Sequence, residues 1–135
     1  MASVYSIETA RQRIGGYASA TALFAPIFAG LDHEALGVAH LDADLGLIRL
    51  TTLNGGRADR IELPLRKVIG DALALGAHAL IVAHNHPHGD PAPSQADKMA
   101  TRRLTETARP LDIRVIDHLI FGGDNVVSFR GLGLL

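Results

Sequence analysis

The stretch HALIVAHNHPHGDPAPSQAD, residues 78–97, joins the pieces of structure that decide the fold. Residues 78–84 are rich in leucine, isoleucine and valine, which predicts a buried strand. Residues 85–93 contain one glycine and three prolines, which predicts a loop. Ser94 then begins a helix that we expect to run to about residue 108, because serine is a favoured N-cap. A strand followed by a loop and a helix is typical of layered α/β domains.

Side chains that can bind a metal stand at both ends of this loop. His84 and His86 are two positions apart, so in an extended backbone both imidazoles face the same side. Asp97 lies in the first turn of the expected helix and can turn its carboxylate back toward them. Two histidines and one carboxylate leave the fourth position of a zinc ion to water, which is the arrangement of a catalytic site rather than a structural one.

Each of these residues also has a simpler interpretation. A His-x-His pair at a strand end is more often unrelated to metal. Ser94 and Asp97 match a helix cap, with Ser94 as N-cap and the acidic side chain of Asp97 favoured by the helix dipole. The two interpretations are compatible, because a cap that fixes the start of the helix also fixes Asp97.

The other histidines are expected to pack in the core or to lie at the surface. His88 stands between a proline and a glycine, which indicates an exposed loop residue, and Asp90 is expected in the same turn. The remaining four occur in or beside apolar strands: His33, His40, His78 and His118.

The rest of the chain predicts helices and strands in mixed order. Helices are expected at 6–14, 18–29 and 64–75, and further strands at 34–42, 48–53, 61–63, 113–121 and 125–129. Gly15 and Gly16 separate the first two helices, Pro26 bends or ends the second, and Gly76 is a C-cap for the third. This order predicts an α/β or α+β domain with a mixed sheet, not a regular βαβ repeat.

Length and composition limit what kind of protein this is. With 135 residues we expect a single domain over 1–135, in which 1–30 form a short helical N-terminal segment. The chain has 0 cysteines, which excludes disulfides, a thiol nucleophile and a cysteine-bound metal. Its 13 Lys+Arg and 14 Asp+Glu give a net charge of −1. The chain therefore lacks the excess positive charge that attracts proteins to nucleic acids. Any bound metal must therefore be held by the 7 histidines and by carboxylates.

The apolar segment 14–31 follows two arginines and so resembles a signal peptide. It contains glycines and a proline and ends in an acidic turn, which argues against export. It is also too interrupted to span a membrane, which needs ~20 apolar residues. The sequence therefore predicts a cytoplasmic protein without a membrane segment.

A hydrolase that uses a metal also needs a base that takes a proton from water and returns it to the leaving group. The glutamates that can serve are Glu8, Glu34, Glu62 and Glu106. Glu8 and Glu106 fit solvated helix positions, whereas Glu34 opens a buried strand and Glu62 lies on a short one. The residue pattern alone leaves the choice between Glu34 and Glu62 open.

The spacing of His84, His86, Ser94 and Asp97 resembles the JAMM motif of the MPN/JAB-domain metalloproteases. The fuller string of residues 84–97 resembles the RadC-like branch of that family more specifically. Two later segments, IRVIDH at 113–118 and VSFR at 127–130, resemble the same branch, and the likeness covers roughly residues 20–135.

The resemblance implies a fold, a cofactor and an activity. The fold is a curved mixed sheet flanked by helices, similar to cytidine-deaminase folds. His84, His86 and Asp97 would bind Zn²⁺, and Glu34 would be the general acid and base. Ser94 would hydrogen-bond the oxyanion of the tetrahedral intermediate. The reaction implied is hydrolysis of a peptide or isopeptide bond, with a peptide or a ubiquitin-like protein as substrate.

The sequence departs from the RadC-like branch in two places. His88 stands where these proteins usually carry serine, which leaves open a metal ligand, a contact to a ligand or a neutral loop substitution. With only about thirty residues before Glu34, we do not expect the helix-hairpin-helix region that is usual in this branch. Arg102, Arg103 and Arg109 form a small basic patch that we interpret as a solvated helix face.

Two other functions remain open at this stage. One is a DNA-repair-associated binding module of the RadC-like kind, and the other is a scaffold with a structural metal. Nucleic acid is not the expected partner, and the sequence leaves open whether the chain is a monomer or a homodimer.

Asp117 and His118 are polar residues within an apolar strand. By strand alternation, Asp117 shares a face with Ile113, Val115, Leu119 and Phe121, and His118 shares the other face with Ile116 and Ile120. At least one of the two is therefore expected to be buried with a hydrogen-bond partner. Our hypothesis is that one of them orients a metal-binding histidine, and the alternative is a hydrogen bond within the sheet.

Overall fold

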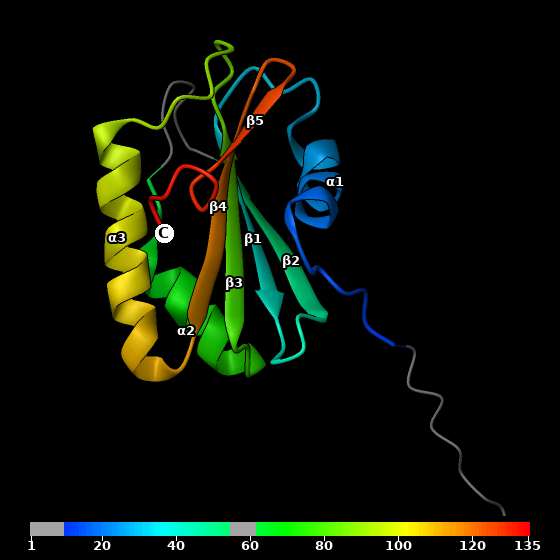
Figure 1. Cartoon of the computed structure of the whole chain (residues 1–135), viewed down its shortest axis with the longest axis vertical. Coiled ribbons are helices and arrows are strands. Elements are labelled where there is room, and N and C mark those ends of the chain that lie inside the picture. The colour runs from blue at the N-terminus through cyan, green and yellow to red at the C-terminus, as the bar shows by residue number, and fades with distance from the viewer. Residues whose placement is uncertain (1–9, 55–61) are drawn as a thin grey trace, which may run out of the picture.

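A five-stranded mixed sheet forms the centre of the computed structural model, which describes residues 10–54 and 62–135 (Figure 1). The elements in chain order are α1 (Tyr17–Phe28), β1 (Ala35–Leu41), β2 (Leu47–Asn54), α2 (Leu65–Leu75), β3 (Ala79–Asn85), α3 (Gln95–Ala108), the 3₁₀ turn η1 (Arg109–Leu111), β4 (Arg114–Gly122) and β5 (Asn125–Ser128). The strand order is β2-β1-β3-β4-β5, and only β3 and β4 run parallel. The predicted α+β class with a mixed sheet flanked by helices is confirmed.

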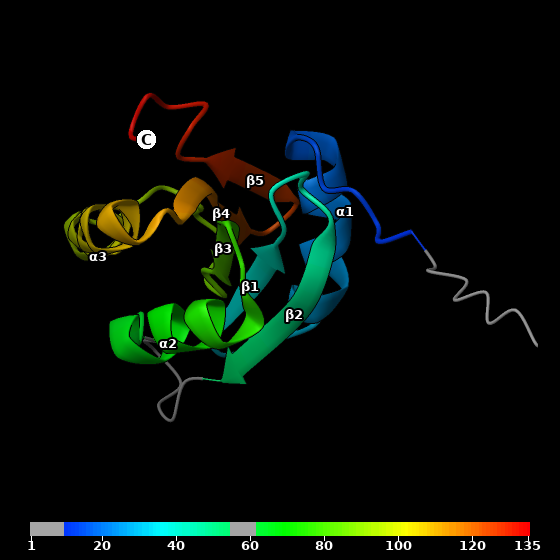
Figure 2. The same ribbon diagram turned by 90° about the horizontal axis from the view of Figure 1, so that it is seen from below.

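Helices cover both faces of the sheet, as Figure 2 shows: α1 lies on one face, and α2 and α3 lie on the other. The two middle strands, β1 and β3, are buried along their whole length. Their sequences are nearly continuous apolar runs, as expected for strands that are covered on both faces. The α1 side of the core includes Phe24, Phe28, Ile81 and Leu119, and the other side includes Val68, Leu80, Val82 and Leu104.

The close approach of α1 to the sheet depends on Gly37 in β1. A Cβ atom at this position would lie 2.8 Å from the ring of Phe24, which is fully buried. The missing side chain therefore leaves the space that the Phe24 ring fills.

The helix expected at 6–14 is wrong for the residues that the structure describes, and residues 6–9 lie outside them. The backbone at 12–14 is extended and lies against the start of β2, where Arg13 bridges Gly46. Ile14 donates its N–H to Leu45 O at 2.9 Å, and Leu47 donates to Gln12 O at 2.8 Å. Ile14 is buried, so this segment is held by an edge bridge and an apolar anchor instead of helical hydrogen bonds.

The short strand expected at 61–63 is wrong for the residues that the structure describes. Glu62 and Leu63 are not in a strand, and Ile61 lies outside the described residues. Pro64, which has no N–H for a strand ladder, follows them and precedes α2. Pro26, which was expected to bend or end the helix at 18–29, lies inside α1, and the helix continues to Phe28. Gly76 caps α2 in the left-handed conformation, as predicted.

A β-bulge in β4 changes the faces that simple alternation predicts. Val115 pairs with Leu80, and Asp117 pairs with the next residue, Ile81, so one residue of β4 is skipped. Val115 accordingly packs on the α3 side of the sheet, whereas Ile116 packs on the α1 side. The expectation that Val115 shares a face with Leu119 is therefore wrong, because an extra residue in one strand shifts the alternation.

The chain crosses from the end of β3 to the start of β4 through α3 and η1. Parallel strands require such a crossover, because the chain must return to the opposite end of the sheet. The first turn of α3 consequently lies near the carboxyl end of β3, where the predicted ligands are. None of the helices in the described ranges is long and apolar enough to cross a membrane.

His40 is a buried polar residue of β1 on the face that α2 covers. It is 1% exposed, and neither ring nitrogen has a hydrogen-bond partner among the described residues. Burial lowers the pKa of His40, and the carboxylate of Asp71 and the carbonyls of Arg49 and Val68 only partly oppose the shift. His40 is therefore neutral in the fold and titrates at a lower pH than in the unfolded chain.

We predict that His40→Leu raises the free energy of unfolding by about 1 kcal/mol at pH 7, because it removes unsatisfied buried nitrogens. The unfolded chain takes up a proton at His40 as the pH falls below about 6.5, and the folded chain takes one up only at a lower pH, so wild-type stability is lost in that direction. The gain from His40→Leu should therefore grow between pH 7 and pH 5 in urea denaturation. His78→Gln, at an exposed histidine, is the control and should show no such growth. An equal pH dependence for wild type and His40→Leu would contradict the prediction.

Candidate metal centre

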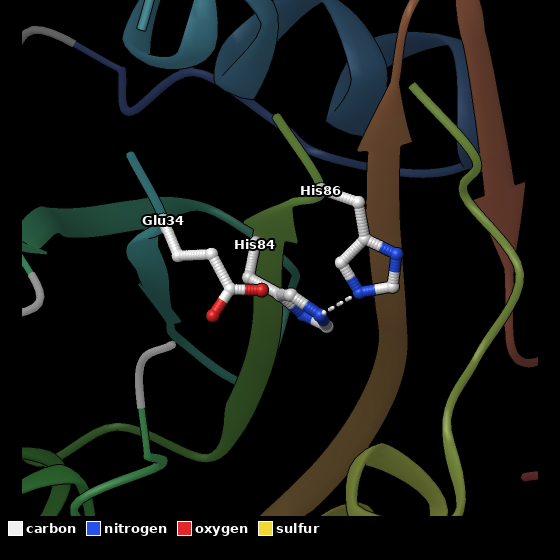
Figure 3. A group of neighbouring side chains, drawn as sticks. All are labelled: Glu34, His84 and His86. Atoms are coloured by element: carbon white, nitrogen blue, oxygen red, sulfur yellow. Dashed lines mark hydrogen bonds between the residues drawn. The ribbon is translucent and has the colours of Figure 1, made fainter. Parts of the chain in front are cut away.

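His84 and His86 lie at the carboxyl end of β3 with their rings directed to the same place (Figure 3). Their Nε2 atoms are 3.0 Å apart, and both side chains are buried. The extended backbone at the end of β3 puts both imidazoles on the α3 side, as the two-residue spacing predicted.

Asp97 completes this group from the first turn of α3. Its Oδ1 lies 3.4 Å from His84 Nε2, and its Oδ2 lies 3.3 Å from His86 Nε2. The three residues predicted as metal ligands are thus brought together by the fold.

The predicted helix cap is present at the same place. Ser94 Oγ accepts the Asp97 N–H at 3.0 Å, and Asp97 Oδ2 accepts the Ser94 N–H at 2.9 Å. This reciprocal capping box holds the Asp97 carboxylate in position. The hydroxyl proton of Ser94 is not used by the cap, and its side chain is exposed.

Glu34 stands immediately before β1, and its side chain points toward His84 in Figure 3. Ligand atoms of Glu34, His84 and His86 all lie within 4.8 Å of one another. Glu62 is exposed and is not part of this cluster. The structure therefore places Glu34, and not Glu62, beside the histidines.

Asn85, which sequence reasoning missed, holds the segment around Glu34. Its Oδ1 accepts the N–H of Ala35 at 2.7 Å, and its Nδ2 donates to the carbonyl of His33 at 3.0 Å. The side chain amide thus binds the backbone on both sides of Glu34. The position of Asn85 in the sequence could have revealed this role. Because it lies between the two histidines, its side chain faces the opposite side of β3, where a polar group needs a hydrogen-bond partner.

The loop after β3 orients His86. His86 Nδ1 donates to the carbonyl of Asp90 at 2.8 Å, which leaves Nε2 without a proton in the neutral ring. Gly122 supports this loop from β4, since a Cβ there would lie 2.7 Å from Pro91 N. His88 is exposed and stacks on His86 with 5.5 Å between ring centroids, in keeping with a loop residue.

His118 is the residue of the Asp117-His118 pair that touches a predicted ligand. Its Nε2 lies 2.6 Å from His84 Nδ1, and its Nδ1 lies 2.6 Å from Thr101 Oγ1. Asp117 instead accepts hydrogen bonds from its neighbour's N–H, from the Ser128 hydroxyl and from the Arg130 N–H. Both residues are buried, and sequence reasoning missed Thr101.

The close packing of Asp97, His86 and His118 shifts the pKa values of their side chains. Burial by itself raises the pKa of Asp97, but hydrogen bonds from His84 and His86 outweigh it and hold that pKa well below its usual range. The hydrogen bond to Asp97 raises the pKa of His86. Burial lowers the pKa of His118 well below its usual value, and His84 adds to the shift. A carboxylate thus stays ionised against two imidazoles, which suits a cation-binding site.

The remaining predicted residues lie away from this cluster. His33 pairs with Asp32, and His78 is exposed. Arg102, Arg103 and Arg109 are exposed on α3 and η1, as expected for a solvated face.

We predict that Asn85→Ala lowers the free energy of unfolding by about 1–3 kcal/mol, because it leaves the Ala35 N–H and the His33 carbonyl without their partner. Urea denaturation measures the change. Asn125→Ala, at an exposed position, is the matched control and should stay within about 0.5 kcal/mol of wild type. If the two variants were equally stable, the amide would not hold the segment that carries Glu34.

Comparison with known proteins identifies the family of the chain. A model of the RadC-like JAB domain matches residues 14–134. The UPF0758 proteins YkfG and YfjY of Escherichia coli K12 are 47% and 46% identical over 107 residues, which is 79% of this chain and 68% and 67% of theirs. A UPF0758 protein of Chromohalobacter salexigens is 46% identical over 105 residues, and the matched part is only 47% of its length. The chain therefore belongs to the RadC-like JAB domain family.

Proposed function

We propose that the protein is a zinc-dependent hydrolase of the JAMM type that cleaves a peptide or isopeptide bond. The observation that carries this proposal is the convergence of His84 Nε2, His86 Nε2 and the Asp97 carboxylate, with contacts of 3.0 to 3.4 Å. Membership of the RadC-like JAB family supports it.

The donor set fits zinc. Two imidazole nitrogens and one carboxylate are ligands that zinc accepts, and zinc–nitrogen bonds of ~2.0–2.1 Å allow one ion to bind two nitrogens that lie 3.0 Å apart. In the neutral ring of His86 the proton lies on Nδ1, which donates to the Asp90 carbonyl, so Nε2 is the nitrogen left to bind a metal. A bound zinc ion would supply Lewis acidity and lower the pKa of water in its open position.

Glu34 and Ser94 are the two residues that we assign to the chemistry itself. The Glu34 carboxylate lies beside the two histidines and is held in place by Asn85 through the backbone on either side. It would take a proton from the attacking water and return it to the leaving amine. Ser94 uses its oxygen as acceptor in the helix cap, so its hydroxyl proton is available to the developing oxyanion.

Zinc content tests the ligand set. We predict about one zinc per chain by elemental analysis of the purified protein, and loss of that zinc in His84→Ala, because two remaining ligands hold the ion poorly. His78→Ala, at the exposed histidine before β3, is the control and should keep the metal. Full zinc content in His84→Ala, or none in the wild type, would overturn the assignment of the site.

Activity tests the role of Glu34. We predict that Glu34→Gln keeps zinc and lowers kcat by about 10²–10⁴-fold, the range of general acid–base catalysis. Glu62→Gln, at the exposed glutamate outside the cluster, is the matched control and should retain activity. The substrates are a panel of short peptides and ubiquitin-like fusion proteins. Unimpaired turnover by Glu34→Gln, or absence of hydrolysis of the whole panel by zinc-loaded wild type, would count against the proposal.

A further inference from the structure

We propose that a cavity at the far end of the sheet from the candidate metal centre binds a small organic phosphate through Arg109, Arg114 and Arg130. The cavity has a volume of about 600 Å³, and all three arginines line it. We call it the arginine cavity. The inference goes beyond the proposed function, because none of the residues of the candidate metal centre lines this cavity.

The arginine cavity lies where α3 ends and β4 begins. Arg109 starts η1 directly after α3, and Arg114 is the first residue of β4. His78, just before β3, also lines the cavity, and it stands six positions before His84. At ~3.3 Å per residue of strand, these two histidines are roughly 20 Å apart. The arginine cavity and the candidate metal centre are therefore separate sites at opposite ends of β3.

β5 covers only part of β4, which leaves room beside the first residues of β4. On the side away from β3, β5 pairs with residues 119–122 and, within the described ranges, with no earlier residue of β4. The chain after β5 turns back toward β4, where the Arg130 N–H donates to Asp117 Oδ1 at 3.0 Å. The buried Asp117 carboxylate also accepts from the Ser128 hydroxyl. Asp117 thus fixes the backbone that carries Arg130.

The segments IRVIDH at 113–118 and VSFR at 127–130 meet at this cavity. Residues 113–116 of the first segment and Arg130 of the second line it. The hydrogen bonds of Asp117 join the two segments. The proposed hydrolysis uses neither Arg114 nor Arg130, so both arginines are available for a second function.

The charge of the lining favours an anion. It contains three arginines and one carboxylate, that of Asp112. In the part of the chain that the structure describes, none of the three arginines forms an ion pair with a carboxylate. The dipole of α3 accounts for a cation at Arg109, at the end of that helix, but not for Arg114 or Arg130. Like charges gathered around a concave surface repel one another and attract an anion.

The size and chemistry of the lining indicate which anion fits. A guanidinium group presents a planar fork of donors that matches two oxygens of a phosphate. A phosphate monoester carries about two negative charges at pH 7, which balances the surplus positive charge of the lining. The volume of about 600 Å³ is typical of a small-molecule site and exceeds the size of a bare phosphate ion. Ile113 and Val115 supply apolar surface for the organic part of the ligand.

A nucleic-acid strand also presents phosphates, but two observations favour a small molecule. The chain has a net charge of −1, whereas nucleic-acid binding draws on an excess of positive charge. The three arginines surround one cavity, whereas a strand requires a positively charged groove that follows its backbone.

The first test is calorimetric titration of the full chain at low ionic strength, where screening is weak, with AMP, UMP and glucose 6-phosphate. At least one of them should bind with a Kd of ~1 mM or lower. The same molecule without its phosphate should bind about 10-fold or more weakly, because the charge-assisted hydrogen bonds are lost. Failure of all three phosphates to bind would overturn the inference, and so would equal binding of adenosine, uridine or glucose.

The second test locates the phosphate with matched variants. Arg114→Gln and Arg130→Gln should each weaken binding about 10-fold or more, because each removes a charged donor. Arg103→Gln is the same change at an exposed arginine of α3 that does not line the cavity, and it should stay within about twofold of wild type. Equal affinities for Arg103→Gln and the two cavity variants would overturn the inference.

Asp112→Asn tests the charge argument in the opposite direction. Asp112 has a left-handed backbone with φ 58°, which asparagine also adopts readily. Removal of the only carboxylate among the described lining residues should tighten phosphate binding about twofold or more. Weaker binding by this variant would contradict the inference.

A single-stranded DNA oligonucleotide is the probe for nucleic acid. If it bound saturably, lost this binding in Arg114→Gln, and none of the three small phosphates bound, the surface would belong to a nucleic acid and the inference would be wrong. Oligonucleotide binding at least 10-fold weaker than that of the best small phosphate is the expected result.

Zinc measurements separate this inference from the proposed function. His84→Ala should bind the small phosphate within about twofold of wild type, and Arg114→Gln should keep the zinc content of wild type. Loss of phosphate binding in His84→Ala would mean that the phosphate binds at the metal, which would overturn the inference. Wild type that holds no zinc but binds the phosphate through Arg114 and Arg130 contradicts the proposed function and supports the arginine cavity.

Discussion

The parallel pairing of β3 with β4 is the interaction on which the rest of the structure depends. It forces a crossover, and α3 makes that crossover by starting near the end of β3 and returning to the start of β4. The first turn of α3 is thereby brought to His84 and His86. The same pairing puts His118 of β4 opposite Val82, close enough to His84 for a hydrogen bond. A single pairing thus assembles the candidate ligands and the residue behind one of them.

Backbone groups orient most of the polar side chains in the candidate site. The Asp90 carbonyl accepts from His86, the Asp97 carbonyl accepts from Thr101, and the backbone beside Glu34 is held by Asn85. The Asp97 carboxylate is itself held by the Ser94 N–H. Side chains that are held by such contacts are oriented before a ligand is bound.

Much of the candidate site could be predicted from sequence because it is local. The spacing of His84, His86, Ser94 and Asp97 lies within fourteen residues, so strand and helix geometry alone indicates that they meet. The choice of Glu34 over Glu62 required the resemblance to a family, because β1 and β3 meet through long-range pairing. Thr101 and Asn85 were missed, since their partners are far away in sequence or belong to the backbone.

The errors in the predicted fold also come from contacts between segments that are distant in sequence. Residues 10–14 have no local pattern that favours an edge bridge over a helix, and only the contact with β2 decides it. The skipped residue at Ile116 in β4 depends on the register with β3 and reverses the faces expected from alternation.

The sequence by itself determined the mixed α+β class, the strand–loop–helix unit of residues 78–97 and the metal-binding character of its polar residues. These follow from periodicity, capping and spacing, which act over a few residues. Only the tertiary structure decided which face His118 occupies, which residues contact His84 and how the segment that carries Glu34 is held. These features depend on strand register and on contacts between segments that are distant in sequence. A local sequence pattern does not specify such contacts.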